Sequence, residues 1–271
     1  MSEVSGQKPV LAFAHANGIP GHSYDTFLAP LKDEYTLHVI DRVGHNPSYP
    51  VDAGWHSLSL ELEAELASLP KPLVGAGHSL GSVLMYLVAQ RRPEWFSALI
   101  MLDPPMMNGI HGMLIAAAKL AKQVDRVTPA GKSKGRLDFW PDWPAVEGYF
   151  GSRGLFRAFD PRCLDDYLKA GLEPFNGGWR LRFRPEVEVA IFRETPTSAT
   201  RMPRLRVPGA IVTGRHSPSP FLHSAQRHVR RHGMLHRIAD GSHMYPLEKP
   251  EATLALFREI LDALLAQEAT V

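Results

Sequence analysis

The feature that most constrains this chain is residues 73–87, where one serine lies between glycines. The first four of these residues form a short apolar run, typical of a buried strand, and residues 83–88 repeat their apolar positions as a buried helix does. Between them, residues 77–81 read Gly-His-Ser-Leu-Gly, the pattern G-x-S-x-G. Glycines are needed there because a strand that turns sharply into a helix brings its neighbours too close for a Cβ. Such a turn exposes the hydroxyl of Ser79 and directs the N–H of Leu80 at whatever the hydroxyl attacks.

The composition is that of an ordinary globular chain. Its 271 residues are 44% hydrophobic and 21% charged, which suits one large α/β domain with an insertion. The formal net charge of +2 is too small to indicate nucleic acid or an acidic membrane as a partner. A single cysteine, Cys163, cannot form an internal disulfide, which suits a reducing compartment. The polar start is unlike a signal peptide, and no apolar run approaches the ~20 residues that span a bilayer, so we expect a soluble, cytoplasmic protein.

Short apolar runs alternate with helical patterns in the first and last parts of the chain. The predicted strands are residues 9–14, 36–40, 73–76, 98–102, 209–213 and 235–238. Apolar residues at helical spacing predict helices at 55–69, with Asp52 as a cap, at 221–229 and near the end of the chain. This alternation predicts an α/β fold with a mostly parallel sheet covered by helices on both faces.

The alternation is lost in the middle of the chain. From Pro105 to about Arg206 the sequence consists of Gly- and Pro-punctuated pieces that are rich in large aromatic residues. These pieces are too apolar to be disordered. We therefore divide the chain into an α/β core, residues 1–104 and 207–271, and an inserted cap, residues 105–206.

Three motifs make the chain resemble a capped α/β-hydrolase over nearly its whole length outside the insertion. Residues 15–18, His-Ala-Asn-Gly, resemble the His-Gly loop that follows the family's third strand, and residues 77–81 resemble the nucleophile elbow. Residues 241–251 resemble the loop with the catalytic histidine before the last helix, and residues 41–45 resemble a loop whose Asp is usually structural. The family normally has an antiparallel hairpin before the His-Gly loop. Only about a dozen residues precede that loop here, so we expect a sheet shortened at the N-terminus.

The resemblance implies a catalytic triad and an oxyanion hole, and the chemistry of the residue types supports both. Serine is a poor nucleophile until a base takes its proton, and His243 is the candidate base for Ser79. The backbone N–H groups of Asn17 and Leu80 match the two oxyanion-hole positions. His15 and His78 are interpreted as structural hydrogen-bonding residues. No cofactor and no metal ion is expected.

The acid is where the sequence departs from the commonest pattern of the family. Most relatives carry it after the strand that follows the cap, and Ser217 occupies that position here. A neutral hydroxyl cannot stabilise the imidazolium that a triad histidine becomes. Some relatives place the acid one strand earlier, where this chain has Asp103, and we predict that Asp103 is the acid. The alternatives are that Asp103 only forms a turn before the cap, and that Asp240 is the acid although it lies very close to His243 in sequence.

Together these assignments predict a serine hydrolase of carboxylic esters or related acyl compounds, including lactones and thioesters. A serine at the elbow excludes the relatives that use a carboxylate there, such as haloalkane dehalogenases and epoxide hydrolases. The alternatives on the same fold are a C–C bond hydrolase, a cofactor-free oxygenase and a non-catalytic ligand receptor. Most aromatic rings of the cap are expected to form its own core. Because a cap also lines part of the pocket, we expect a small, apolar acyl substrate, and neither nucleic acid nor a membrane as partner. The sequence leaves the oligomeric state open.

Two further features receive structural interpretations. His228 and His232 have the i, i+4 spacing of a metal-binding pair on a helix. Arginines surround them and no carboxylate or cysteine lies nearby in sequence, so a solvated basic face is expected. Cys163 is expected to be a small buried hydrophobic residue and not a nucleophile.

Overall fold

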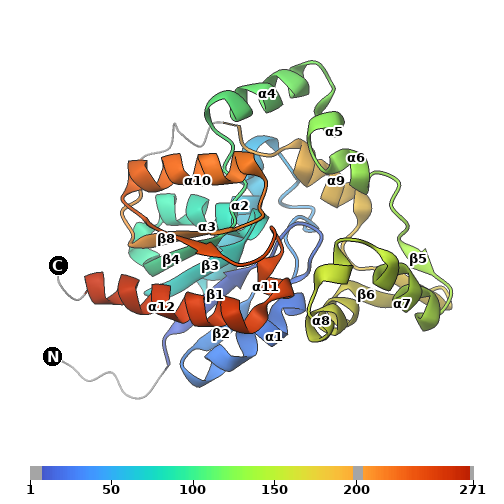
Figure 1. The fold of residues 1–271 in the computed structure, drawn as a ribbon, viewed down its shortest axis with the longest axis horizontal. Helices are drawn as coiled ribbons and strands as arrows, with labels where there is room; N and C mark the ends of the chain where they lie inside the picture. The colour runs from blue at the N-terminus through green and yellow to red at the C-terminus, as the bar shows by residue number, and fades with distance from the viewer. Residues whose placement is uncertain (1–7, 198–203, 269–271) are drawn as a thin grey trace.

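The computed structural model describes residues 8–197 and 204–268 of the chain. Its larger sheet has the strand order β2-β1-β3-β4-β8-β9, and every neighbouring pair is parallel (Figure 1). The strands are β1 (Val10–Ala14), β2 (Thr36–Val39), β3 (Leu73–His78), β4 (Phe96–Leu102), β8 (Gly209–Gly214) and β9 (Leu235–Ala239). Each one overlaps a run that the sequence predicts as a strand, so the predicted α/β fold is confirmed.

Side chains alternate along the strands and divide the core into two layers. Leu11 and Phe13 of β1 pack in one layer with α1 (Asp25–Leu28) and α12 (Pro250–Glu268). Val10, Ala12 and Ala14 pack in the other, with α2 (His56–Ala67), α3 (Leu80–Arg91) and α10 (Ser219–His232). Figure 1 shows α12 and α1 on one side of the sheet and α10, α2 and α3 on the other. Burial of both faces explains why the strands are continuous apolar runs.

Two expectations concern the start of the chain and of α2. Within the described residues no strand precedes β1, and the large sheet contains no antiparallel pair. The predicted cap Asp52 accepts a hydrogen bond at Oδ1 from the N–H of Ser57 (2.8 Å), across the short 3-10 turn η3 (Ala53–Trp55).

No helix in the described part of the chain is both long and apolar enough to cross a bilayer. Residues 1–7, which carry most of the polar start, lie outside the described residues.

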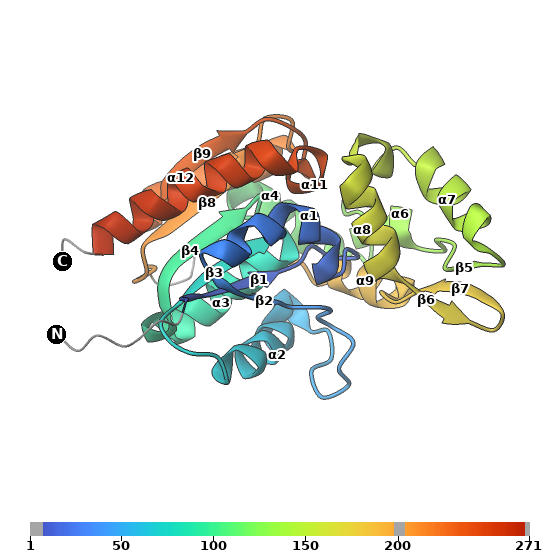
Figure 2. The ribbon, with the colours of Figure 1, turned by 90° about the horizontal axis from the view of Figure 1, so that it is seen from below.

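The neighbouring strands β4 and β8 are separated in sequence by an insertion, residues 103–208, that leaves the sheet at the carboxyl end of β4 (Figure 2). Its helices are α4 (Gly109–Leu120), α5 (Val124–Val127), α6 (Ala130–Ser133), α7 (Trp143–Ser152), α8 (Pro161–Gly171) and α9 (Pro185–Arg193). A small antiparallel sheet in the order β5-β7-β6 joins β5 (Phe139–Trp140), β6 (Leu172–Phe175) and β7 (Gly178–Leu181). The division at residues 105–206 stays a prediction, and residues 198–203 of it lie outside the described residues.

Aromatic residues hold the insertion together, and its helix α8 attaches it to the core. Neighbouring rings of the set Trp140, Tyr149, Phe150, Phe156 and Tyr167 lie 4.7–5.3 Å apart, as expected for a packed aromatic core. Helix α8 docks on α1, where Asp166 Oδ2 accepts hydrogen bonds from the N–H (2.8 Å) and hydroxyl (2.6 Å) of Thr26. Cys163 on α8 is fully buried, and burial raises the pKa of its thiol to about 12. The prediction that Cys163 is a buried apolar residue is therefore confirmed.

The prediction that His228 and His232 lie on a solvated face of α10 is wrong. Side chains of His228 and His232 are only 2% and 5% exposed, and both rings contact Tyr86 of α3. The i, i+4 spacing places them on one face, and α10 turns that face towards α3, while the neighbouring arginines point outward. Among the described residues, no third His, Cys, Asp or Glu completes a metal-binding group. Burial, with the neighbouring His232 and Arg231, lowers the pKa of His228 to about 3.

Burial of His228 predicts that the stability of the fold depends on pH. His228 is neutral in the folded protein but protonates near its ordinary pKa when the chain unfolds, so stability present above about pH 6.5 is lost as the pH falls towards 3. Over that range, such a group lowers the free energy of unfolding by up to about 1.4 kcal/mol for each pH unit of acidification. We expect His228→Leu to weaken the fall in melting temperature between about pH 7 and pH 5, while His223→Leu, at an exposed position of the same helix, leaves it unchanged. An identical pH dependence in both variants would contradict this account.

Candidate active site

Ser79 lies at the turn between β3 and α3, with a left-handed backbone (φ 51°). Its N–H donates a hydrogen bond to the carbonyl oxygen of Leu102 (2.8 Å). A Cβ at Gly81 would lie 2.1 Å from the carbonyl oxygen of Ala14, and a Cβ at Gly77 would lie 2.5 Å from the carbonyl carbon of Gly81. Close backbone contact therefore requires both glycines, as the sequence predicts, and it places Ser79 at the carboxyl end of the sheet.

His243 follows β9 and lies between Ser79 and Asp103. Its Nε2 is 3.1 Å from Ser79 Oγ, and its Nδ1 is 2.5 Å from Asp103 Oδ2. An ionised carboxylate can only accept a hydrogen bond, so Nδ1 carries the proton and Nε2 is free to accept the serine hydroxyl. The structure thus brings together three residues that lie far apart in the sequence, in an arrangement that can move a proton from serine to histidine.

The carboxylate of Asp103 is completely buried directly after β4, and its backbone is left-handed (φ 44°). The hydroxyl of Ser217 donates to Oδ2 (2.7 Å), and the N–H of Gly214 donates to Oδ1 (3.3 Å). These donors supply the hydrogen bonds that a buried carboxylate needs. Asp240, the other candidate acid, is exposed and pairs with Lys249 instead. Sequence reasoning placed Ser217 at the usual position of the acid but missed its contact with Asp103.

His78 connects the elbow to two other loops of the site. Its Nε2–H donates to the carbonyl oxygen of His243 (2.8 Å), and its Nδ1 accepts from the hydroxyl of Tyr24 (2.7 Å). The oxygen of Tyr24 accepts in turn from the N–H of Ala16 (3.3 Å), in the loop that carries Asn17. Burial, together with the nearby His243, lowers the pKa of His78 well below its ordinary value, so the ring is neutral and holds one tautomer.

His15 has a similar structural role in the loop after β1. Its Nδ1–H donates to the carbonyl oxygen of Ala16 (2.8 Å), and its Nε2 accepts from the N–H of Val43 (2.9 Å). Burial lowers the pKa of His15, which keeps this tautomer neutral. The prediction that His15 and His78 are structural hydrogen-bonding residues is confirmed by these contacts.

A cavity of about 1040 Å³ opens beside Ser79 and His243. Asn17 and Leu80 line it. Among the described residues, neither of their backbone N–H groups donates a hydrogen bond in a turn, a loop or a helix end. The insertion supplies apolar side chains to the wall, namely Met107, Ile115, Val127, Leu137, Tyr149, Leu155, Phe156 and Phe192. The cavity is therefore bounded by the serine, the histidine, two unused backbone donors and an apolar surface.

A buried carboxylate of the insertion, Glu188 on α9, contacts the loop after β1. Its Oε1 accepts from the hydroxyl of Ser133 and its Oε2 from Nη1 of Arg136, both at 2.7 Å. The backbone carbonyl of Glu188 accepts from Nδ2 of Asn17 (2.9 Å), and a Cβ at Gly18 would lie 3.0 Å from its carboxyl carbon. The insertion thus fixes the conformation of the Asn17 loop. Nothing in the sequence signals this contact, because its partners are 171 residues apart.

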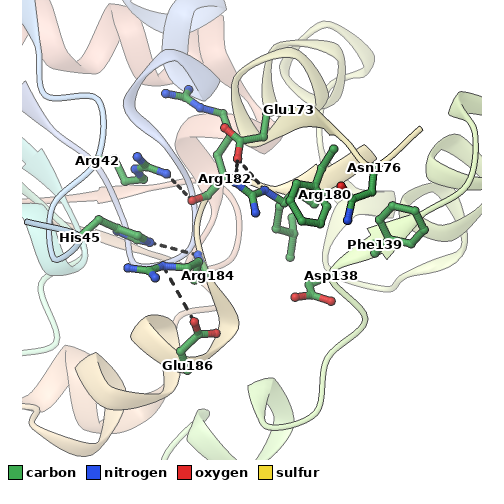
Figure 3. A pocket seen from close by; sticks show the side chains of 12 residues that line it. Arg42, His45, Asp138, Phe139, Glu173, Asn176, Arg180, Arg182, Arg184 and Glu186 are labelled. Carbon is green, nitrogen blue, oxygen red and sulfur yellow. Dashed lines mark hydrogen bonds and ion pairs between the residues drawn. The ribbon is translucent and has the colours of Figure 1, made fainter. Parts of the chain in front are cut away.

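A second cavity, of about 910 Å³, lies between the loop after β2 and the β5–β7 region (Figure 3). Two of its arginines are held in ion pairs: Arg180 pairs with Glu173 of the lining, and Arg182 pairs with Asp41 outside it, both at 2.7 Å. His45 Nε2 accepts the N–H of Arg184 (3.1 Å), and burial beside Arg42 lowers the pKa of His45 to about 4. The lining contains no serine, threonine or cysteine. This cavity is therefore a junction between core and insertion, and it lacks the nucleophile and base of the first.

The hydrogen bonds of Tyr24 give a testable consequence. Tyr24→Phe removes the hydroxyl that His78 Nδ1 and the N–H of Ala16 share, leaving buried polar atoms unpaired. We expect the free energy of unfolding, measured with urea, to fall by about 1–3 kcal/mol. Tyr49→Phe is the matched control, because the Tyr49 hydroxyl has no hydrogen-bond partner among the described residues. Equal stability of the two variants would contradict this role of Tyr24.

Two curated proteins that this chain resembles in sequence are a thioesterase and an esterase. A type I acyl-CoA thioesterase from Penicillium roqueforti (strain FM164) is 28% identical over 177 residues, which cover 58% of this chain and 38% of that protein. A pimeloyl-[acyl-carrier protein] methyl ester esterase from Vibrio atlanticus (strain LGP32) is 28% identical over 126 residues, covering 42% of this chain and 47% of that protein. The matched region thus spans less than half the length of these relatives.

Solved structures share the fold over nearly the whole chain. The thioesterase domain from the curacin biosynthetic pathway superposes with a TM-score of 0.70 at 18% identity, covering 94% of this chain and 92% of that one. E-2-(acetamidomethylene)succinate hydrolase gives a TM-score of 0.73 at 19% identity, covering 95% and 93%. The family model described as "Alpha/beta hydrolase family" matches residues 11–256. With a match over most of its length, this protein belongs to the α/β-hydrolase family.

Proposed function

We propose that this protein is a serine hydrolase that cleaves a carboxylic ester or a related acyl bond. Ser79 is the nucleophile, His243 the general base and Asp103 the acid that orients it. The observation that carries the proposal is the continuous chain of contacts from Ser79 Oγ through His243 to the buried carboxylate, beside a cavity. The names of the two curated relatives, a thioesterase and a methyl ester esterase, support acyl transfer to water.

The first half of the reaction forms an acyl-enzyme. Ser79 Oγ attacks the carbonyl carbon of the substrate while its proton passes to His243 Nε2. The carbonyl oxygen becomes an oxyanion, and the N–H groups of Leu80 and Asn17 donate hydrogen bonds to it. When the intermediate collapses, the bond to the leaving group breaks and His243 protonates that group. The leaving group departs and the acyl group stays on Ser79.

The second half repeats these steps with water as the nucleophile. His243 takes a proton from water, the resulting hydroxide attacks the acyl carbon, and Ser79 leaves with the proton from the imidazolium. In both halves Asp103 stabilises the positive charge on the ring and holds Nδ1–H in place. Ser217 and Gly214 hold the carboxylate in turn through their hydrogen bonds to its two oxygens.

Residues 105–206 act as a cap over this site in our proposal. They supply most of the apolar wall of the cavity, and Glu188 ties them to the loop that carries Asn17. An enclosed wall of this kind suits an acyl group of limited size. It also keeps bulk water away from the oxyanion, which strengthens the two backbone hydrogen bonds.

Loss of the nucleophile is the direct test of this function. Ser79→Ala should lower kcat on p-nitrophenyl butyrate by roughly 10⁶, since removing a triad serine has that effect in a comparable enzyme. A fluorophosphonate probe should label the wild type and not this variant. Ser152→Ala, an exposed serine of α7, should keep both labelling and turnover. Absence of labelling and turnover in the wild type would favour a ligand receptor or another reaction on this fold.

The acid is tested separately. Asp103→Asn should lower kcat by about 10⁴, because an amide in this position favours the wrong tautomer of His243. Ser217→Ala removes one hydrogen bond to the carboxylate and should lower kcat only about tenfold. Asp240→Asn is the control, since Asp240 is exposed and bound to Lys249. A small loss in Asp103→Asn, or a large one in Asp240→Asn, would contradict the assignment.

A further inference from the structure

The cavity beside Ser79 carries more positive than negative charge. Four cationic side chains line it, and Glu188 is its one carboxylate. Arg136 is neutralised by Glu188 (2.7 Å). The other three cations, Lys132, Lys134 and Arg153, are exposed, and within residues 8–197 and 204–268 none of them forms an ion pair. These three residues are called the cationic rim below.

The cationic rim lies on the solvent side of the cavity. Three apolar residues that line the cavity near it in the sequence, Val127, Leu137 and Leu155, are about half exposed (56%, 49% and 49%). Residues of the inner wall, such as Met107 and Ile115, are 8% exposed. Arg153 also stacks on the ring of Tyr149, with its Cζ 4.3 Å from the ring centroid, which holds the guanidinium beside the cavity.

The reaction order decides which part of the substrate meets the cationic rim. In a serine hydrolase the acyl group stays covalently bound to Ser79 after the first step, whereas the leaving group has to depart before water can attack. The leaving group therefore needs the path to solvent, and the acyl group occupies the inner, apolar part of the cavity. A charge on the leaving group would then lie at the mouth of the cavity, among Lys132, Lys134 and Arg153.

We propose that the leaving group is a phosphate-bearing thiol of the phosphopantetheine type, and that the cationic rim binds its phosphate. This inference rests on the proposed function and narrows its substrate to acyl thioesters. Phosphate suits such a site because it stays anionic whether it is free or esterified, and its oxygens accept hydrogen bonds from lysine and arginine together. The same phosphopantetheine group occurs in free coenzyme A and on acyl carrier proteins, so the chemistry is shared by both sources.

Matched substrates test the proposal. S-butyryl-coenzyme A, S-butyryl-4′-phosphopantetheine and a butyryl carrier protein share one pantetheine thioester with S-butyryl-pantetheine, which has no phosphate. We expect the wild type to have a kcat/KM at least about tenfold higher for the phosphate-bearing thioesters, and this ratio to fall when salt rises from about 50 to about 500 mM. Comparing the three phosphate-bearing substrates identifies the preferred source.

Substitutions in the cationic rim then locate the preference. Lys132→Gln, Lys134→Gln and Arg153→Gln should each lower the ratio of kcat/KM values by roughly two- to fivefold, and the triple variant should bring it close to one. Arg126→Gln, an exposed cation of α5 outside the cavity lining, should leave the ratio unchanged. Melting temperatures of the variants establish that they are folded.

Three results would overturn the proposal. The first is equal kcat/KM for phosphate-bearing and phosphate-free thioesters in the wild type. The second is a triple variant that keeps the wild-type ratio. The third is a triple variant that loses activity only on S-succinyl-N-acetylcysteamine, because the cations would then bind an anionic acyl group. If the wild type hydrolyses no thioester and no p-nitrophenyl ester, the proposed function itself fails as well.

Discussion

Close contact between three backbone segments at the carboxyl end of the sheet sets the geometry of the site. The end of β1, the turn at Ser79 and the first turn of α3 approach so closely that neither Gly77 nor Gly81 has room for a Cβ. The N–H of Gly81 donates to the carbonyl oxygen of His15 (3.0 Å), which fixes the loop with Asn17 against the same turn. The spacing between Ser79 and the loop that carries Asn17 is thus a property of the main chain, and side chains refine it.

Features with a local cause could be predicted from the sequence. The six strands of the large sheet are apolar runs because both of its faces are buried, and such runs stand out without knowledge of the fold. The turn at Ser79 is equally local, since the glycines it needs lie within two residues of the serine. Asp103 was predicted as the acid because some members of the family that the chain resembles place the acid directly after this strand, although its contact with His243 joins residues 140 positions apart.

Features that depend on distant contacts could not be predicted. Spacing alone placed His228 and His232 on one face of a helix, but the direction of that face depends on how α10 packs on α3. Similarly, no pattern connects Glu188 with Asn17, which meet only when the insertion folds back beside the sheet, or Ser217 with Asp103, which meet only when β8 pairs with β4. The cation content of the cavity escaped notice for the same reason, and the aromatic residues of the cap had suggested only an apolar acyl group as substrate.

The order of the proposed catalytic groups along the chain affects how the protein acquires reactivity during synthesis. Asn17 and Ser79 precede the insertion and Asp103 is its first residue, whereas His243 comes 140 residues after Asp103. A chain that grows from its N-terminus can pair β1, β3 and β4 early, but β9 joins the sheet only beside β8, after the whole insertion has been made. Until then Ser79 lacks the proton acceptor that we propose for it. On the proposed mechanism a nascent chain therefore carries an inert serine, and an acyl-enzyme can form only when the sheet is complete.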